Sequence, residues 1–187
     1  QKLLKQLGIT FPETPTPEDA QSLVAEIENL IGDREIKDLV DLPIIVDEEK
    51  IAIVQTIASI NPAAYNAGSS LFSVLVSFAV KFSIEYGNTS ASSFAYATYG
   101  IVACNMLQDI NTGVKFGLLA LETVSKLDAK AFKPQVIQIV AGFTLHRTSH
   151  IKSTIPLLQE AYTSGIEVGN HEYAGHSAAV FCLNSFW

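Results

Sequence analysis

Histidines and cysteines are the residues in this sequence that could bind a metal ion or support acid–base chemistry. His146 and His150 are spaced to share one helix face, and His171-Glu172 with His176 forms a second group. A zinc site needs three or four converging His, Cys or carboxylate ligands, and no Cys or acid lies close to the first pair. His150 also falls near an expected helix end. We interpret these histidines as ordinary surface or helix-end residues and predict no metal site.

The sequence also lacks motifs for nucleophilic catalysis and for phosphate binding. Ser177 and Ser185 lie near histidines but form no nucleophile motif. The glycines of Gly113-Val-Lys-Phe-Gly117 lack the phosphate-loop pattern and fall within an expected helix. Neither the H-R-D nor the D-F-G motif of protein kinases occurs. The sequence predicts no catalytic residue and no cofactor in this segment.

Composition and charge favour a cytoplasmic protein. The net charge of -7 repels nucleic acid and acidic membrane surfaces, so we expect neither as a partner. Cys104 and Cys182 each lie in an apolar helical stretch, and we expect buried free thiols in a reducing compartment. We find no membrane-spanning apolar run and no signal peptide. Because the chain starts at Gln1 and stops at Trp187 within an apolar pattern, we interpret it as a segment of a longer protein.

The elements that must position these residues are helices. Residues 1–46 are expected to form an N-terminal linker and helix, in which Thr16 caps a helix, Pro17 takes its first position and Gly32 ends it. Asp47 is expected to cap the next helix, which we predict to end at Asn61-Pro62.

A pattern of small and apolar residues recurs along the rest of the chain. The stretch 71–88 aligns with 112–129 and with 153–170, an interval of about 41 residues. Its aligned positions include Ala79, Ala120 and Ala161, and two of its copies end at Gly87 and Gly169. A small residue in mid-helix is typical of a site where a second helix crosses closely. The pattern predicts an all-α fold, a right-handed stack of antiparallel helical hairpins, with repeats at 47–87, 88–128 and 129–169 and a truncated fourth at 170–187.

These hairpins resemble tetratricopeptide repeats, in which small residues recur at fixed places on both helices. Gly100 matches the small position of the first helix, and Gly113 and Ala120 match those of the second. Thr154 and Ala161 repeat the second-helix part. The interval here is longer than that family's 34 residues, and the aromatic positions do not follow its pattern.

A second resemblance covers almost the whole chain. Phrases such as LLKQLGITFPETPT, IEYGNTSASSFAYATYGI and PLLQEAYTSGIEVGNHEYAGH are similar to the middle region of very large bacterial signalling kinases, frequent in cyanobacteria. In that family a serine/threonine kinase domain and a STAND-type ATPase come first, and a GAF sensor domain and often a histidine kinase come last. The resemblance implies a helical regulatory region, and it carries over no catalytic residue.

A binding groove is expected along the first helices of the hairpins, which line the concave side of such a stack. One equivalent position on these helices is occupied by Asn105, His146 and Trp187 in three successive repeats. These side chains could line a groove, or they could be unrelated residues near helix ends.

The last helix is expected to lack a covering partner. Ala174, Ala178, Cys182 and Phe186 follow at intervals of four residues and form an apolar stripe. An uncovered stripe of this kind usually meets another surface, so we predict self-association through this helix, as a dimer about a two-fold axis.

Three functions fit these features. The first is a non-catalytic sensor or protein-interaction region of a signalling kinase, whose partner is a protein, another domain of the same chain or a small-molecule signal. The second is a structural spacer that couples the ATPase to the sensor domain. The third, less favoured, is an all-helical enzyme fragment.

Overall fold

The computed structural model describes residues 2–12 and 14–186, and the all-α prediction is confirmed. The α-helices are α1 (Lys2–Gln6), α2 (Pro17–Ile31), α3 (Glu48–Asn66), α4 (Leu71–Tyr86), α5 (Ser90–Asn105), α6 (Ile110–Lys126), α7 (Lys133–Ile139), α8 (Ile155–Glu167) and α9 (His171–Ser185). Four short helical pieces complete the fold: the 3₁₀ turns η1 (Ile36–Asp41), η3 (Leu145–Arg147) and η4 (Ile151–Thr154), and the π-helical turn η2 (Val140–Thr144).

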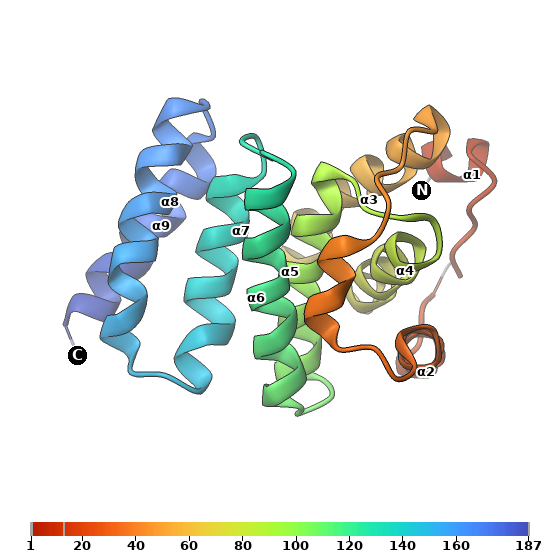
Figure 1. The fold of residues 1–187 in the computed structure, drawn as a ribbon, viewed down its shortest axis with the longest axis horizontal. Helices are drawn as coiled ribbons and strands as arrows, with labels where there is room; N and C mark the ends of the chain where they lie inside the picture. Colours follow the sequence, from red (N-terminus) through yellow and green to blue (C-terminus); the bar gives the residue numbers. More distant parts are fainter. Residues whose placement is uncertain (1, 13, 187) are drawn as a thin grey trace.

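Helices pack mostly against their neighbours in sequence, as antiparallel pairs do (Figure 1). The pairs are α3 with α4, α5 with α6, and α7 with α8, and α9 packs on α8. The first helices α3, α5, α7 and α9 also contact one another in that order and form a layer of their own. They begin at Glu48, Ser90, Lys133 and His171, so the pairs do not follow one fixed interval.

The N-terminal region packs onto this array. Helix α2 lies against α4, and η1 lies beside α6 (Figure 1). Leu4, Ile27 and Leu39 are buried in the same hydrophobic cluster as the side chains of α3 to α6. Residues before Asp47 therefore share a core with the helix pairs that follow.

The small residues aligned in the sequence lie on the second helices. Ala79 is on α4, Ala120 on α6 and Ala161 on α8, and all three are buried. Helices α5 and α6 approach each other closely where Gly100 faces Gly113: a Cβ added to either glycine would lie within 3.0 Å of the other's carbonyl oxygen. Small residues therefore let these two backbones approach.

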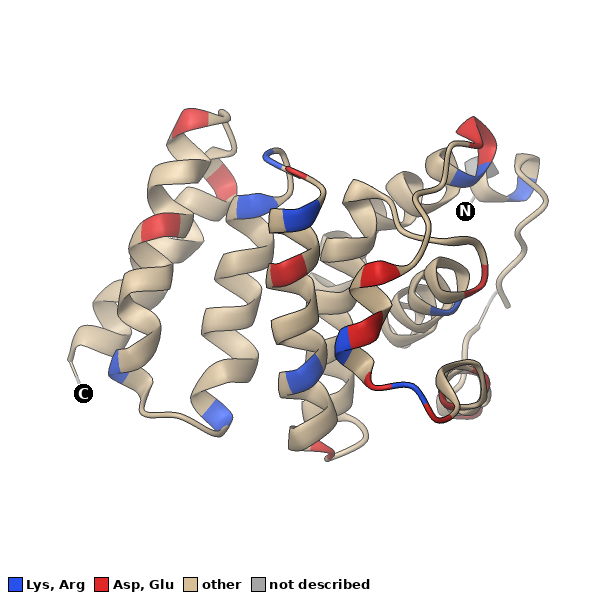
Figure 2. Cartoon of the chain, viewed as in Figure 1, with Lys and Arg blue, Asp and Glu red and all other residues tan. Residues whose placement is uncertain are grey.

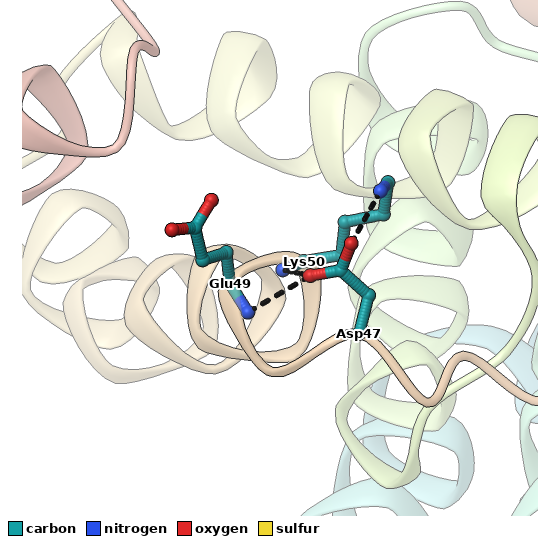
Figure 3. Close-up of polar contacts among 3 residues, drawn as sticks. All are labelled: Asp47, Glu49 and Lys50. Atoms are coloured by element: carbon teal, nitrogen blue, oxygen red, sulfur yellow. Dashed lines mark hydrogen bonds and ion pairs between the residues drawn. The ribbon is translucent and has the colours of Figure 1, made fainter.

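Local capping rules account for the predicted helix starts. Thr16 forms a capping box with Asp19, Pro17 is the first residue of α2, and Gly32 closes it. Asp47 caps α3: its Oδ1 accepts hydrogen bonds from the backbone N–H groups of Glu49 and Lys50, and its Oδ2 lies 2.7 Å from Lys50 Nζ (Figure 3). These predicted caps are confirmed.

Removing the charge of Asp47 should make stability less sensitive to acid. The hydrogen bond from Lys50 holds the pKa of Asp47 below its ordinary value. A carboxyl group whose pKa is depressed by folding stabilises the fold above its ordinary pKa, and this contribution is lost as the pH falls. We expect Asp47→Asn to lower the melting temperature most at neutral pH, with the difference from the parent shrinking below about pH 4. Asp33→Asn, in the exposed turn after α2, is the matched control. A pH-independent difference would contradict this assignment.

The predicted end of α3 and the predicted burial of Cys182 were wrong. Helix α3 does not end at Asn61-Pro62 but continues to Asn66, with Pro62 inside it. Proline disfavours a helix interior because it lacks an N–H donor, but packing outweighs that preference here, since Ala64 is buried and Tyr65 contacts Phe72 edge to face. Cys182 is exposed, whereas Cys104 is buried as expected.

Charged residues are unevenly distributed over the fold. Figure 2 shows them on α6 and on the elements around it, whereas α5 carries none from Ser90 to Asn105. This composition fits a helix covered on nearly all sides. Within 2–12 and 14–186, no helix combines the length and apolar character needed to cross a bilayer.

Candidate functional site

A pocket of about 120 Å³ lies among the first helices, and we call it the first-helix pocket. Each of the four first helices contributes to its wall, as do one residue of α4 and one of η2. The lining residues are Asn61, Pro62, Tyr65, Asn66, Phe72, Phe94, Thr98, Ile101, Gln138, Ile139, Phe143, Glu172, Tyr173 and His176. The pocket therefore depends on the correct packing of all the helix pairs.

Two helix irregularities border this pocket. Pro62 interrupts the backbone hydrogen bonding of α3, and α7 passes at Val140 into the π-helical turn that carries Phe143. Thr144 stabilises that turn by donating its hydroxyl proton to the Val140 carbonyl oxygen at 2.9 Å. Single π-helical turns are rare in proteins and are frequent at functional sites, because the extra residue redirects side chains.

Buried amides form the polar part of the wall. Asn61 is 2 % exposed and Gln138 is 5 % exposed. The Thr98 hydroxyl donates to the Phe94 carbonyl oxygen at 2.8 Å, so its oxygen is left to accept the Asn61 Nδ2 donor at 3.4 Å. Asn61 Oδ1 has no hydrogen-bond partner among the described residues. Leaving such an acceptor unpaired costs about 1–3 kcal/mol, so Asn61 is a residue of this wall whose hydrogen bonding is incomplete.

Aromatic rings form much of the remaining wall. Tyr65 packs edge to face on Phe143, with ring centroids 6.0 Å apart, and on Phe72, with centroids 5.1 Å apart. Phe94 and Tyr173 line the same space from α5 and α9. The pocket combines aromatic surface with few polar groups, as small-molecule sites commonly do.

The side of the pocket formed by α9 carries two ionisable side chains. His176 Nε2 lies 3.8 Å from Glu172 Oε1, and both side chains are mostly exposed. Burial, together with the nearby Glu172 carboxylate, raises the pKa of Tyr173 to about 12. Tyr173 therefore stays neutral in the physiological range, and Glu172 is the one acidic residue among those that line the pocket.

A larger hollow of about 850 Å³ lies between α2, η1 and α6. Several of its charged rim groups already have partners within the protein. Arg34 donates to the Ile31 carbonyl oxygen at 3.2 Å, Lys37 lies 2.7 Å from Glu35, and Asp109 caps α6 by accepting from Thr112 N–H at 2.9 Å. We therefore regard the smaller first-helix pocket as the better candidate site.

The groove residues predicted from the sequence lie elsewhere. Asn105 ends α5 and accepts a hydrogen bond from Arg147 at 2.7 Å. His146 is half-buried in η3, where burial and the adjacent Arg147 lower its pKa. Neither residue lines the first-helix pocket. Trp187 lies outside the described residues.

The remaining histidines do not converge. His150 is not on a helix face shared with His146, because the helix has already changed to η3, and its Nδ1 accepts from Lys152 N–H at 3.1 Å. In the part of the chain that the structure describes, no group of three or more His, Cys, Asp or Glu side chains is placed to hold a metal ion.

The stripe predicted on α9 is only partly uncovered. Ala174 is buried and Ala178 is half-buried, whereas Cys182 is exposed and Phe186 is 93 % exposed. The reason is geometric: four residues exceed one helical turn of 3.6, so an i, i+4 stripe drifts around the helix. Its far end leaves the interface with α8. The exposed residues Gly175, Ala179, Cys182, Leu183 and Phe186 form what we call the outer strip of α9.

Sequence reasoning missed the first-helix pocket. Its polar wall combines Asn61 and Gln138, which are far apart in the chain and line one pocket because α3 and α7 both pack on α5. The available signal was an amide side chain within an apolar helical run, such as Gln138 in VIQIV. An amide in such a run either lies on a polar side of its helix or is buried, and a buried amide needs hydrogen-bond partners.

Comparison with known proteins gives one distant, partial match. The chain is 26 % identical over 125 residues to the hybrid signal transduction histidine kinase G of Dictyostelium discoideum. The match covers 66 % of this chain but only 4 % of that protein's length. No family model matches the chain. No solved structure matches it. The chain is thus distantly similar to part of a signalling histidine kinase, and no catalytic site is evident in the residues described.

Proposed function

We propose that this segment is a non-catalytic regulatory region of a cytoplasmic, signal-transducing protein kinase. In this proposal the antiparallel helix pairs form a right-handed, tetratricopeptide-like stack that senses a ligand or docks a protein. The observation that carries it is the first-helix pocket, whose wall holds an unpaired buried acceptor but no cluster of catalytic groups. The distant similarity to part of a histidine kinase supports the signalling context.

A structural spacer between an ATPase and a sensor domain is the competing function. A spacer needs a stable stack but no pocket with an unpaired polar atom. Thermal shift of the purified segment against a panel of metabolites, with a pull-down from lysate, separates the two functions. We expect at least one small molecule or one protein to bind, and this binding to weaken in Asn61→Leu. If nothing binds, the sensor proposal is wrong and the spacer function is supported.

Self-association is a further expected property of the isolated segment. The outer strip of α9 contains small residues that permit close approach, next to Leu183 and Phe186, which are 64 % and 93 % exposed. A two-fold contact between two copies of this strip would cover these side chains. We expect sedimentation at high concentration to give a mass near twice 20.2 kDa.

A substitution on the strip should weaken this dimer by about tenfold, the equivalent of 1.4 kcal/mol. Leu183→Ser is the test, and Leu118→Ser is the matched control, because Leu118 is similarly exposed on α6, away from α9. A monomer at high concentration, or equal weakening by both substitutions, would show that the outer strip is not the contact.

A further inference from the structure

Asn61 lines the first-helix pocket, and its buried side-chain oxygen Oδ1 is unpaired among the described residues. Thr98 uses its only proton on the Phe94 carbonyl oxygen, which fixes Asn61 Nδ2 toward Thr98 and leaves Oδ1 as an acceptor. A matching ligand must therefore present an N–H or O–H group. A purely apolar ligand or a quaternary ammonium ion would leave Oδ1 unpaired.

The aromatic wall favours a positive charge. Tyr65, Phe72, Phe94, Phe143 and Tyr173 all line the same small space. The faces of aromatic rings carry negative electrostatic potential and attract ammonium groups, the more so when the ion is desolvated. A cation would thus be stabilised where an anion would be repelled.

Glu172 adds a carboxylate on the α9 side. The residues that line the pocket include this one acid and no Lys or Arg, and the whole chain has a net charge of -7. His176 is the one other ionisable neighbour here apart from the tyrosines, and it lies 3.8 Å from Glu172. The local field therefore also favours a cationic ligand.

Taken together, the geometry points to a small primary or secondary amine, bound as the ammonium ion, as the ligand of the first-helix pocket. Its N–H group donates to Asn61 Oδ1, its charge lies among the aromatic rings, and Glu172 attracts it to the site. The volume of about 120 Å³ is below that of drug-sized sites and suits a head group with a short chain or a single ring. This inference rests on the proposed function, since it names the ligand class of the sensor.

Three probes of similar shape separate charge from hydrogen bonding. Benzylamine has both a charge and N–H donors, benzyl alcohol has a donor without charge, and benzyltrimethylammonium has a charge without a donor. We expect benzylamine or butylamine to bind the purified segment in an NMR titration, and benzylamine to bind at least tenfold more tightly than either control. Equal affinities for the three benzyl probes, or no binding of either amine, would overturn the assignment.

Two substitutions locate the contact. Asn61→Leu keeps a similar volume and removes the acceptor, so it should weaken benzylamine at least tenfold while leaving the melting temperature equal or higher. Glu172→Gln should weaken benzylamine about threefold and leave benzyl alcohol unchanged, whereas Glu167→Gln on α8, outside the pocket, should change neither. Unaltered benzylamine binding in Asn61→Leu would contradict the site.

The outcomes also separate this inference from the proposed function. If the amines fail to bind while another metabolite or a protein still binds in an Asn61-dependent way, the ligand class is wrong and the sensor function survives. If the segment instead binds ATP in a saturable way, the non-catalytic function is wrong whatever the amines do.

Discussion

Replacing Gly113 with alanine should destabilise the fold by roughly 1–3 kcal/mol or more, the range observed for overpacked cores. A Cβ at this position would overlap Cys104 Sγ and would lie 2.9 Å from the Gly100 carbonyl oxygen. The Cys104 side chain can rotate away, but a helix backbone cannot, so α5 and α6 must move apart. We expect the melting temperature to fall by roughly 2–4 °C for each kcal/mol lost.

Gly175 in α9 provides a control of opposite sign. No atom of the described residues lies within 4 Å of the Cβ that alanine would add there. Gly175→Ala should therefore stabilise the chain by about 0.4–1 kcal/mol, because it restricts the unfolded state without a clash. Calorimetric melts of the two variants give both values, and a stable Gly113→Ala variant would show that α5 and α6 do not cross at these glycines.

Replacing Gly87 with alanine should cost roughly 2–4 kcal/mol, from backbone strain and overpacking together. Gly87 has φ of 115°, which side chains with a Cβ rarely adopt, and an added Cβ would overlap the Pro43 carbonyl oxygen. The neighbouring Asn88 ties this turn to η1 and the residues just after it: its N–H donates to the Pro43 oxygen at 2.7 Å and its Nδ2 donates to the Leu39 oxygen at 2.8 Å. The substitution should therefore loosen η1 as well.

Gly169 tests whether the crowding at Gly87 matters beyond its φ angle. Its φ is 74°, and within the part of the chain that the structure describes no atom lies within 4 Å of an added Cβ. Gly169→Ala should cost only about 1 kcal/mol, the strain of a left-handed residue. Denaturant unfolding of both variants measures the difference, and equal losses would mean that the close approach of Pro43 adds nothing to the cost at Gly87.

Local rules explain what could be predicted from the sequence. Thr16, Asp47 and Gly32 act through hydrogen bonds or backbone angles within a few residues, and each was placed correctly. The local rule failed at Pro62 because the tertiary packing of Tyr65 extends α3 beyond it. Gly87 and Gly169 occupy equivalent positions in the sequence, at the ends of two copies of the recurring stretch. Of the two, only Gly87 is so placed that an added Cβ would overlap a carbonyl group distant in sequence.

Long-range packing explains what could not be predicted. The π-helical turn at Val140–Thr144 and the placement of Asn61 and Gln138 in one pocket wall depend on how α3 and α7 pack on α5. Helix geometry explains why the stripe on α9 is buried at Ala174 and exposed at Phe186. Predicting which end is buried, however, requires knowing which side of α9 is covered by α8. For these reasons the helices were predicted well and the pocket was not.

The central claim is that this segment contributes binding rather than catalysis to signalling. The most direct measurement is a calorimetric titration of ATP with magnesium into the purified segment. The account predicts no saturable heat of ATP binding, because neither a phosphate-binding loop nor a kinase motif is present in the sequence. Saturable, stoichiometric ATP binding would contradict it.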